Sequence, residues 1–180
     1  MEIRETRADD LAEVLRVERE AFGQEEEAEL VVGLLADPSA EPRLSLVAID
    51  GERTVGHVLF TRATLEAEGP ESDLELSILA PLAVAPEAQG KGVGGRLVEH
   101  GHGLLRQRGV DLVFVLGHPG YYPRFGFEPA LPHGLEATYP ILDAQSDAWM
   151  VLALRQGALE GVGGRVICAD ALNHPEMWLE

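Results

Sequence analysis

Cysteine and basic side chains are scarce in this sequence, and each shortage excludes a class of protein. Cys168 is the single cysteine among 180 residues, so an intrachain disulfide and a cysteine-rich metal site are both excluded. There are 14 Lys and Arg against 31 Asp and Glu, which gives a formal net charge of −17. Because phosphates would be repelled, this charge argues against nucleic acid or an anionic membrane surface as a partner, whereas a cationic small substrate is compatible with it.

Long apolar runs are also missing. No stretch approaches the roughly 18 to 20 apolar residues that span a bilayer, and Met1 to Glu5 lacks the apolar core of a signal peptide. We therefore expect a cytoplasmic protein without a membrane partner. The length and the 46% hydrophobic content are typical of a globular protein, and they predict one domain over residues 1–180.

Strand and helix patterns alternate along the chain in an order that predicts a mixed α/β fold. Glu2 to Glu5 is predicted to be a short strand, and two helical patterns follow before Asp37-Pro38, where proline disfavours continuation. Asp50-Gly51 separates two β-rich runs, at 44–49 and 54–61, and readily takes the positive φ angles of a tight hairpin. An acidic loop is expected around Gly69-Pro70. The later predicted elements are strands at 74–84, 111–116, 149–154 and 165–168 and a helix at 94–108.

Two features of these later elements bear on the topology of the sheet. The strand-helix-strand order predicts that strands 74–84 and 111–116 run parallel. Pro81 interrupts the first of them, which predicts a bulge or an unpaired edge at that point.

Glycine is concentrated at positions 90, 92, 94 and 95, where a predicted strand turns into a predicted helix. The first amides of a helix lack internal partners and bind anions, and the helix dipole adds a favourable field. Glycine also leaves room for a phosphate to approach the backbone. The segment is therefore predicted to hold a diphosphate, although glycine marks ordinary turns without a ligand as well.

Two well-known phosphate motifs fit this segment poorly. A Walker-type loop requires Gly-x-x-x-x-Gly-Lys followed by Ser or Thr, whereas Ala85 and Gly92 stand at the first and last of these positions. A dinucleotide fingerprint can be counted from Gly90 to Gly95, but it requires an acidic residue where the next strand ends, at Leu116-Gly117. Neither motif accounts for the glycines.

A third motif matches in residue type, spacing and context. Gln89-x-x-Gly92-x-Gly94, which follows Leu82-Ala83-Val84, resembles the acetyl-CoA signature of the GNAT superfamily of N-acetyltransferases. The later segment from Tyr121 to Phe127, Tyr-Tyr-Pro-Arg-Phe-Gly-Phe, is most similar to the YhbS-like branch of that superfamily. The resemblance is strong from Leu82 through Phe127, and the order of elements agrees over most of the chain.

The resemblance implies the GNAT fold, an α/β (α+β) mixed sheet that is mostly antiparallel, contains a splayed parallel pair and is flanked by helices. Acetyl-CoA would lie in the gap between the strand ending at Val84 and the strand ending at Leu116, without a metal. The residues implied to contact the pantetheine arm are Leu82, Ala83 and Val84, and those around the pyrophosphate are Gln89, Gly90, Lys91, Gly92, Val93, Gly94 and Gly95. Lys91 could equally be a solvated loop lysine.

The same resemblance suggests which group protonates the departing CoA sulfur. Tyr122 stands four residues before the glycine of Gly126-Phe127, where related enzymes place the tyrosine that protonates the CoA sulfur. The alternative is that both tyrosines only pack the lid of the pocket. For the general base, Glu75 on the strand leading to the cofactor is the candidate, with His57 or water as alternatives.

These inferences predict an N-acetyltransferase that transfers an acetyl group to a primary amine of a small molecule or protein by direct attack. The alternative is a CoA-binding regulatory or sensing domain without catalysis, because a fold does not guarantee activity. The amine acceptor stays unidentified, and the protein is expected to be a monomer or a homodimer.

The first helix is expected to bury Leu11, Val14, Leu15 and Phe22. In similar proteins the first two helices border the acceptor site. Their acidic residues are expected to form a solvated face, and the alternative is that they draw in a cationic amine; they are Glu18, Glu20, Glu25, Glu26, Glu27 and Glu29.

Overall fold

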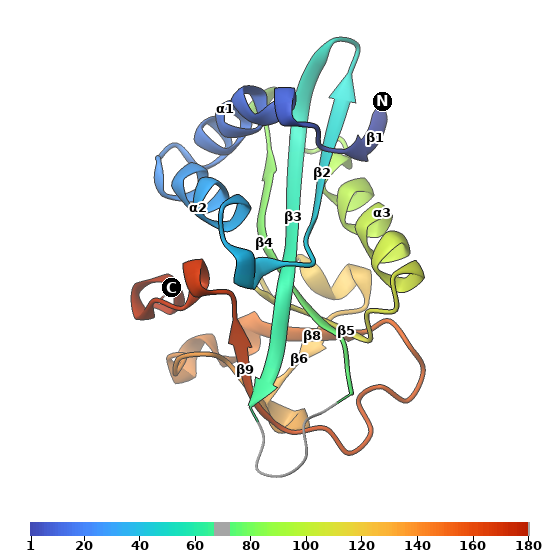
Figure 1. Cartoon of the computed structure of the whole chain (residues 1–180), viewed down its shortest axis with the longest axis vertical. Coiled ribbons are helices and arrows are strands. Elements are labelled where there is room, and N and C mark those ends of the chain that lie inside the picture. The colour runs from blue at the N-terminus through green and yellow to red at the C-terminus, as the bar shows by residue number, and fades with distance from the viewer. Residues whose placement is uncertain (67–72, 180) are drawn as a thin grey trace.

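The computed structural model describes residues 1–66 and 73–179, and a mixed sheet runs through them (Figure 1). Its strands follow the order β1-β2-β3-β4-β5-β8-β6, and β9 pairs with the end of β3 and with β7. Neighbouring strands are antiparallel except for β4–β5 and the short β7–β9 pair. The strands are β1 (Glu2–Glu5), β2 (Leu44–Asp50), β3 (Arg53–Glu66), β4 (Leu76–Val84), β5 (Leu112–Leu116), β6 (Glu128–Pro129), β7 (Leu135–Glu136), β8 (Trp149–Ala153) and β9 (Gly164–Cys168).

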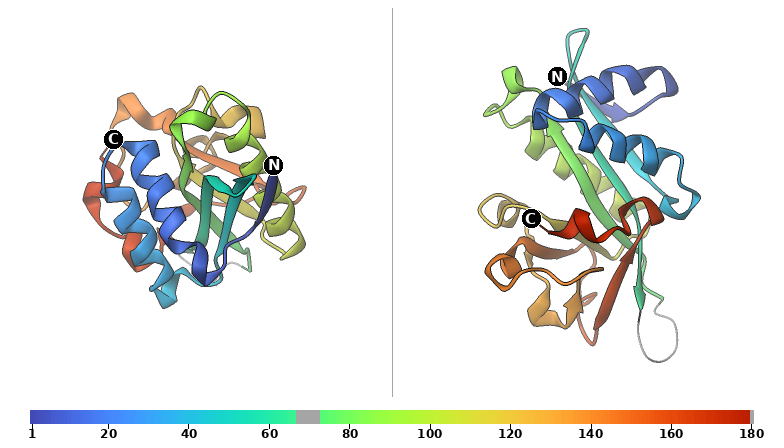
Figure 2. Two further views of the ribbon diagram at one scale, coloured as in Figure 1. Left: turned by 90° about the horizontal axis from the view of Figure 1, so that it is seen from above. Right: turned by 90° about the vertical axis from the view of Figure 1, so that its left-hand side faces the viewer.

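Helices cover both faces of the sheet, as the two views of Figure 2 show. One face carries α1 (Leu11–Phe22) and α2 (Glu26–Leu35), and the other carries α3 (Val93–Gln107). Strand alternation separates the two layers of the core. Val47 of β2 packs with residues of α1 and α2, whereas its neighbours Leu46 and Ala48 pack with α3.

The central parallel pair is short and then diverges. Residues 76–78 of β4 lie opposite residues 112–114 of β5. Beyond them β4 stays paired with β3 as far as Val84, and β5 stays paired with β8 as far as Leu116. The edge of β4 that faces away from β3 is therefore unpaired after Ile78, and such an edge accepts an added extended chain. The predicted mixed sheet with a splayed parallel pair is confirmed.

A bulge lies in the middle of β4, as the position of Pro81 in the sequence indicates. Val58 of β3 is opposite Leu82 and Phe60 is opposite Leu79, so Ala80 and Pro81 form an extra step in β4. Proline donates no ladder hydrogen bond, and a bulge is one of the few positions where a strand tolerates it.

The hairpin and the later helix are also confirmed, with shifted boundaries. Asp50 pairs with Arg53 across a two-residue turn in which Gly51 has φ +65°. β3 is longer than predicted because its C-terminal end gains a partner in β9. The loop predicted around Gly69-Pro70 lies outside the described residues.

The inner face of α1 differs from the prediction. Leu11 and Phe22 are exposed, and the buried residues are Val14, Val17 and Glu18. These three share one helical stripe, at spacings of three and four residues. Glu18 therefore does not belong to a solvated acidic face: its side chain is fully buried.

Candidate cofactor and active site

The glycine-rich turn leaves β4 through a short 3-10 turn, Pro86–Ala88, and enters α3. Gly90 and Gly92 have φ of +74° and +81°, a left-handed conformation that favours glycine, and nothing lies within 4 Å of where their side chains would be. The first helical hydrogen bond runs from the Arg96 amide to the Gly92 carbonyl. The amides of residues 93–95 consequently have no partner inside the helix and are free for an anion above an open glycine surface.

Gly94 and Gly95 have a different environment from Gly90 and Gly92. A methyl group on Gly94 would lie 2.7 Å from the Oη atom of Tyr121, and one on Gly95 would lie 3.3 Å from the ring of Phe125. Both aromatic residues belong to the segment that follows β5. The second half of the glycine cluster thus lets this segment pack directly on α3, whereas only the first half presents an open surface.

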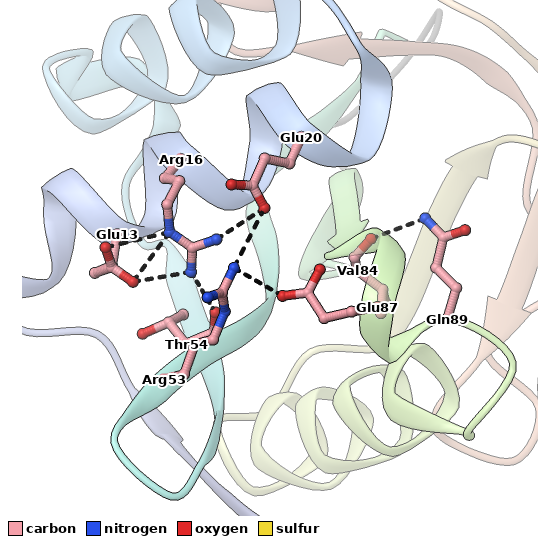
Figure 3. Close-up of polar contacts among 8 residues, drawn as sticks. All are labelled: Glu13, Arg16, Glu20, Arg53, Thr54, Val84, Glu87 and Gln89. Carbon is pink, nitrogen blue, oxygen red and sulfur yellow. Dashed lines mark hydrogen bonds and ion pairs between the residues drawn. The ribbon is translucent and has the colours of Figure 1, made fainter.

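The last residues of β4 supply the unpaired edge beside this turn. Leu82, Ala83 and Val84 pair with β3 on one side, and β5 has already diverged on the other. Gln89 folds back so that its Nε2 atom donates to the Val84 carbonyl at 3.0 Å (Figure 3). The motif glutamine therefore has a local structural role, because this bond connects the turn to the end of the strand.

Ion pairs fasten the same turn to α1, as Figure 3 shows. Arg53 at the start of β3 contacts Glu87 at 2.9 Å and Glu20 of α1 at 3.8 Å. Arg16 bonds Glu20 at 2.8 Å and the Thr54 carbonyl at 2.7 Å. Because Arg53 balances the Glu87 carboxylate, the acidic residue nearest the turn repels an incoming phosphate less.

Lys91 is held close to the backbone of the turn. Its Nζ atom donates to the Glu87 carbonyl at 2.9 Å, and the residue is exposed. One hydrogen bond thus holds the ammonium group near the turn while the side chain stays exposed to solvent. It contributes positive charge beside the free amides of α3.

Tyr122 starts the 3-10 turn Tyr122–Phe125, shortly after β5 ends. Its ring is buried against Gly117 and packs edge-on against Tyr121 and Phe127. Burial, with Tyr121 nearby, raises the pKa of the Tyr122 hydroxyl above its usual value. The hydroxyl therefore keeps its proton at neutral pH and can act as a donor.

The two candidate bases are placed differently from Tyr122. Glu75 is exposed and precedes β4, at the end where β4 and β5 are still paired, so it lies outside the region where the strands diverge. His57 is fully buried on the α1 side of β3. Its Nδ1 atom is 2.6 Å from Glu18 Oε1, and its Nε2 atom is 2.9 Å from Ser45 Oγ.

This Glu18–His57 pair is the feature that sequence reasoning missed. The second Glu18 oxygen has no hydrogen-bond partner among the described residues, and burial raises the pKa of the carboxyl while His57 opposes the shift. The one available signal was spacing, because Glu18 stands on the stripe of Val14 and Val17. Its partner, 39 residues later, carries no comparable signal.

Residues 1–66 and 73–179 contain neither a metal-binding group nor a membrane-spanning helix. Within these ranges the His, Cys, Asp and Glu side chains form no group of three suited to hold a metal ion. None of the helices there is both long and apolar enough to cross a bilayer.

Comparison with known proteins gives a consistent result. Residues 2–130 match the family described as acetyltransferase (GNAT) domain. The uncharacterized N-acetyltransferase YjhQ of Escherichia coli K12 is 49% identical over 162 residues, which cover 89% of this chain and 88% of that protein. The uncharacterized N-acetyltransferase YhbS of the same organism is 37% identical over 149 residues, covering 82% and 84% of the two chains.

Solved structures with the same fold include two bacterial acetyltransferases. One is the crystal structure of the Escherichia coli YhbS acetyltransferase in complex with CoA, which superimposes with a TM-score of 0.86 at 34% sequence identity. The match covers 96% of this chain and 92% of the YhbS chain. A GNAT acetyltransferase from Brucella melitensis in complex with acetyl-CoA has a TM-score of 0.74 at 30% identity, with coverage of 95% and 97%. Together with the divergent β4–β5 pair and the glycine turn at the start of α3, these matches show that the chain belongs to the GNAT acetyltransferase family.

Proposed function

We propose that this protein transfers the acetyl group of acetyl-CoA to a primary amine of a small molecule or protein. The observation that carries the proposal is the conjunction of two unsatisfied backbone surfaces, the β4 edge beyond Ile78 and the amides of residues 93–95 above Gly90 and Gly92. The first suits the amide-containing pantetheine arm, and the second suits a pyrophosphate. The CoA and acetyl-CoA found in the YhbS and Brucella melitensis structures support the same cofactor here.

The proposed cofactor contacts follow from this placement. Leu82, Ala83 and Val84 bind the pantetheine arm through their backbone groups. The turn from Gln89 to Gly95 holds the pyrophosphate, and Lys91 adds positive charge beside it. In this arrangement Gly94 and Gly95 contribute their amides and also admit the aromatic residues of the segment after β5.

The chemistry requires an uncharged amine, attack on the thioester carbonyl, and departure of the CoA sulfur with a proton. Tyr122 is the proposed donor to that sulfur, because it stands four residues before Gly126, where related enzymes place this tyrosine, and its hydroxyl carries a proton at neutral pH. The amine must also lose a proton. We assign that proton to water, since Glu75 lies outside the divergent region and His57 is enclosed by Glu18 and Ser45.

A cationic acceptor fits the charge of the protein. The net charge is −17, and Glu26, Glu27 and Glu29 cluster in the first turn of α2. Such a field raises the local concentration of positively charged amines and lowers that of anionic competitors.

Turnover of acetyl-CoA with a panel of primary amines tests the proposal. Free thiol is followed with diamines, amino sugars and peptides bearing a free N-terminus, and at least one is expected to accelerate release above hydrolysis. Gly92→Asp should abolish that release because it places a carboxylate at the phosphate surface. Gly109→Asp is the matched control: Gly109 has φ +83° and the same open surroundings, but it lies at the opposite end of α3. Cofactor binding without turnover for any amine would favour the regulatory or sensing domain instead.

A further inference from the structure

Tyr121, which the motif leaves without a role, reaches the first turn of α3. Its Oη atom lies so close to Gly94 that a methyl group there would be 2.7 Å away. The same point is 3.5 Å from Val84 Cγ2 and 3.8 Å from Leu82 Cδ2. The Tyr121 hydroxyl therefore stands where the end of β4 meets the start of α3.

The ring of Tyr121 is held on several sides. Arg124 lies over one face, with its guanidinium carbon 4.6 Å from the ring centroid, and its Nε atom donates to the Tyr121 carbonyl at 2.9 Å. Phe125 and Tyr122 pack against the ring edge-on, with centroids 5.3 and 5.1 Å away. A ring fixed in this way directs its hydroxyl with little conformational freedom to lose on binding.

The hydroxyl itself has no hydrogen-bond partner among the described residues, although the side chain is half-buried. A tyrosine in such a place usually finds a partner for its polar tip. The neighbours of this tip are the strand end assigned to the pantetheine arm and the helix start assigned to the pyrophosphate. A ligand spanning those two surfaces passes within reach of the oxygen.

We propose that Tyr121 is a cofactor-binding residue whose hydroxyl donates a hydrogen bond to CoA or acetyl-CoA where the pyrophosphate joins the pantetheine arm. This inference rests on the proposed function. The two adjacent tyrosines would then have different roles. Tyr121 is directed to α3 and binds the cofactor, whereas Tyr122 packs against Gly117 beyond the end of β5 and protonates the departing sulfur.

Calorimetric titration with CoA, run beside thermal unfolding without ligand, tests this division. Tyr121→Phe is expected to raise the Kd for CoA roughly 3- to 10-fold, the value of one hydrogen bond. It should leave the Tm unchanged, because the hydroxyl makes no bond within the free protein. Tyr122→Phe, the matched control, should change the Kd less than Tyr121→Phe does.

The outcomes separate this inference from the proposed function. Equal CoA affinity of wild type and Tyr121→Phe would overturn the role of Tyr121 alone. A fall in Tm that accompanies the loss of affinity would also overturn it, by showing that the hydroxyl is structural. Absence of CoA binding by folded wild type would sink the proposed function and this inference together.

A second variant tests the contact with Gly94. Gly94→Ala should displace the Tyr121 hydroxyl and weaken CoA binding at least as much as Tyr121→Phe. In the double variant the oxygen is gone and the methyl group fits, so affinity should be no lower than in Tyr121→Phe. Gly103→Ala, in the same helix with open space around it, is the control. Additive losses in the double variant would contradict the proposed contact, because coupled residues give non-additive effects.

Discussion

The two faces of the sheet are organised differently around the same strands. On the α3 face, the features that matter belong to the backbone: the unpaired edge of β4, the left-handed Gly90 and Gly92, and free amides. On the α1–α2 face they belong to side chains, and the buried pair of Glu18 and His57 is their centre. The spacing of glycines in the sequence can predict a backbone site, whereas a side-chain pair depends on two residues that are far apart in the sequence.

The physical costs differ in the same way. Backbone amides at a helix start are exposed whether or not a ligand is present, so the α3 face forms with little penalty. Burying a carboxylate is expensive unless a partner is supplied, so the α1 face depends on His57. Substitutions in the buried pair should therefore act mainly on stability, whereas substitutions around the glycine turn should act mainly on cofactor binding.

Removal of His57 is expected to have the largest effect. His57→Leu leaves the buried Glu18 carboxyl without its partner and should cost about 3 to 5 kcal/mol of unfolding free energy, measured by urea denaturation. CoA affinity of the folded protein should change little, because the His57 side chain bonds Glu18 and Ser45 and not the glycine turn, although His57 lies opposite Ala83 of β4. Glu18→Leu/His57→Leu should recover most of the loss. A double variant as unstable as His57→Leu would contradict this account of the pair.

His102, within the α3 layer, should give the protein a pH-dependent stability. Burial, with a smaller contribution from Arg106, lowers the pKa of His102 to about 4 from an ordinary 6.5. As the pH falls below 6.5, His102 takes up a proton in the unfolded chain but stays neutral in the folded protein. The free energy of unfolding therefore falls by about 3 kcal/mol between pH 6.5 and 4. Unfolding of His102→Leu across this range should show a shallower acid limb. A substitution at exposed His100 is the control and should leave the limb unchanged.

Tyr122→Phe should lower the rate of acetyl transfer while leaving CoA affinity nearly unchanged. We expect kcat to fall roughly 100-fold, which corresponds to about 2.7 kcal/mol of activation free energy. The experiment compares steady-state turnover with CoA affinity for wild type and variant. Unchanged kcat would assign both tyrosines to packing alone.

Glu75→Gln should have the smallest effect. Because Glu75 is exposed at the paired end of β4, we expect kcat to change by less than about twofold, within the range of surface substitutions. A pH–rate profile of the variant provides the check. A large loss of kcat together with a lost basic limb would restore Glu75 as the general base.

The contrast between the faces also explains how much could be predicted. The hairpin at Asp50-Gly51, the parallel β4–β5 pair, the bulge at Pro81 and the turn from strand to helix at the glycines follow from local patterns, and the structure confirms them. The pairings of β9 with β3 and β7 have no such local pattern. The environments of Gly94 and Gly95 could not be predicted, since Tyr121 and Phe125 reach them only through tertiary packing. The burial of Glu18 was missed because an acidic residue on an apolar stripe is expected in water until its partner is known.

Calorimetric titration of the purified protein with acetyl-CoA, beside Gly92→Asp and Gly109→Asp, tests the central claim most directly. The account predicts binding by wild type and Gly109→Asp and a loss of at least about 100-fold in Gly92→Asp, because like charges brought together at a binding surface cost several kcal/mol. Equal binding by all three proteins would place the cofactor elsewhere. No binding by folded wild type would contradict the proposed acetyl transfer itself.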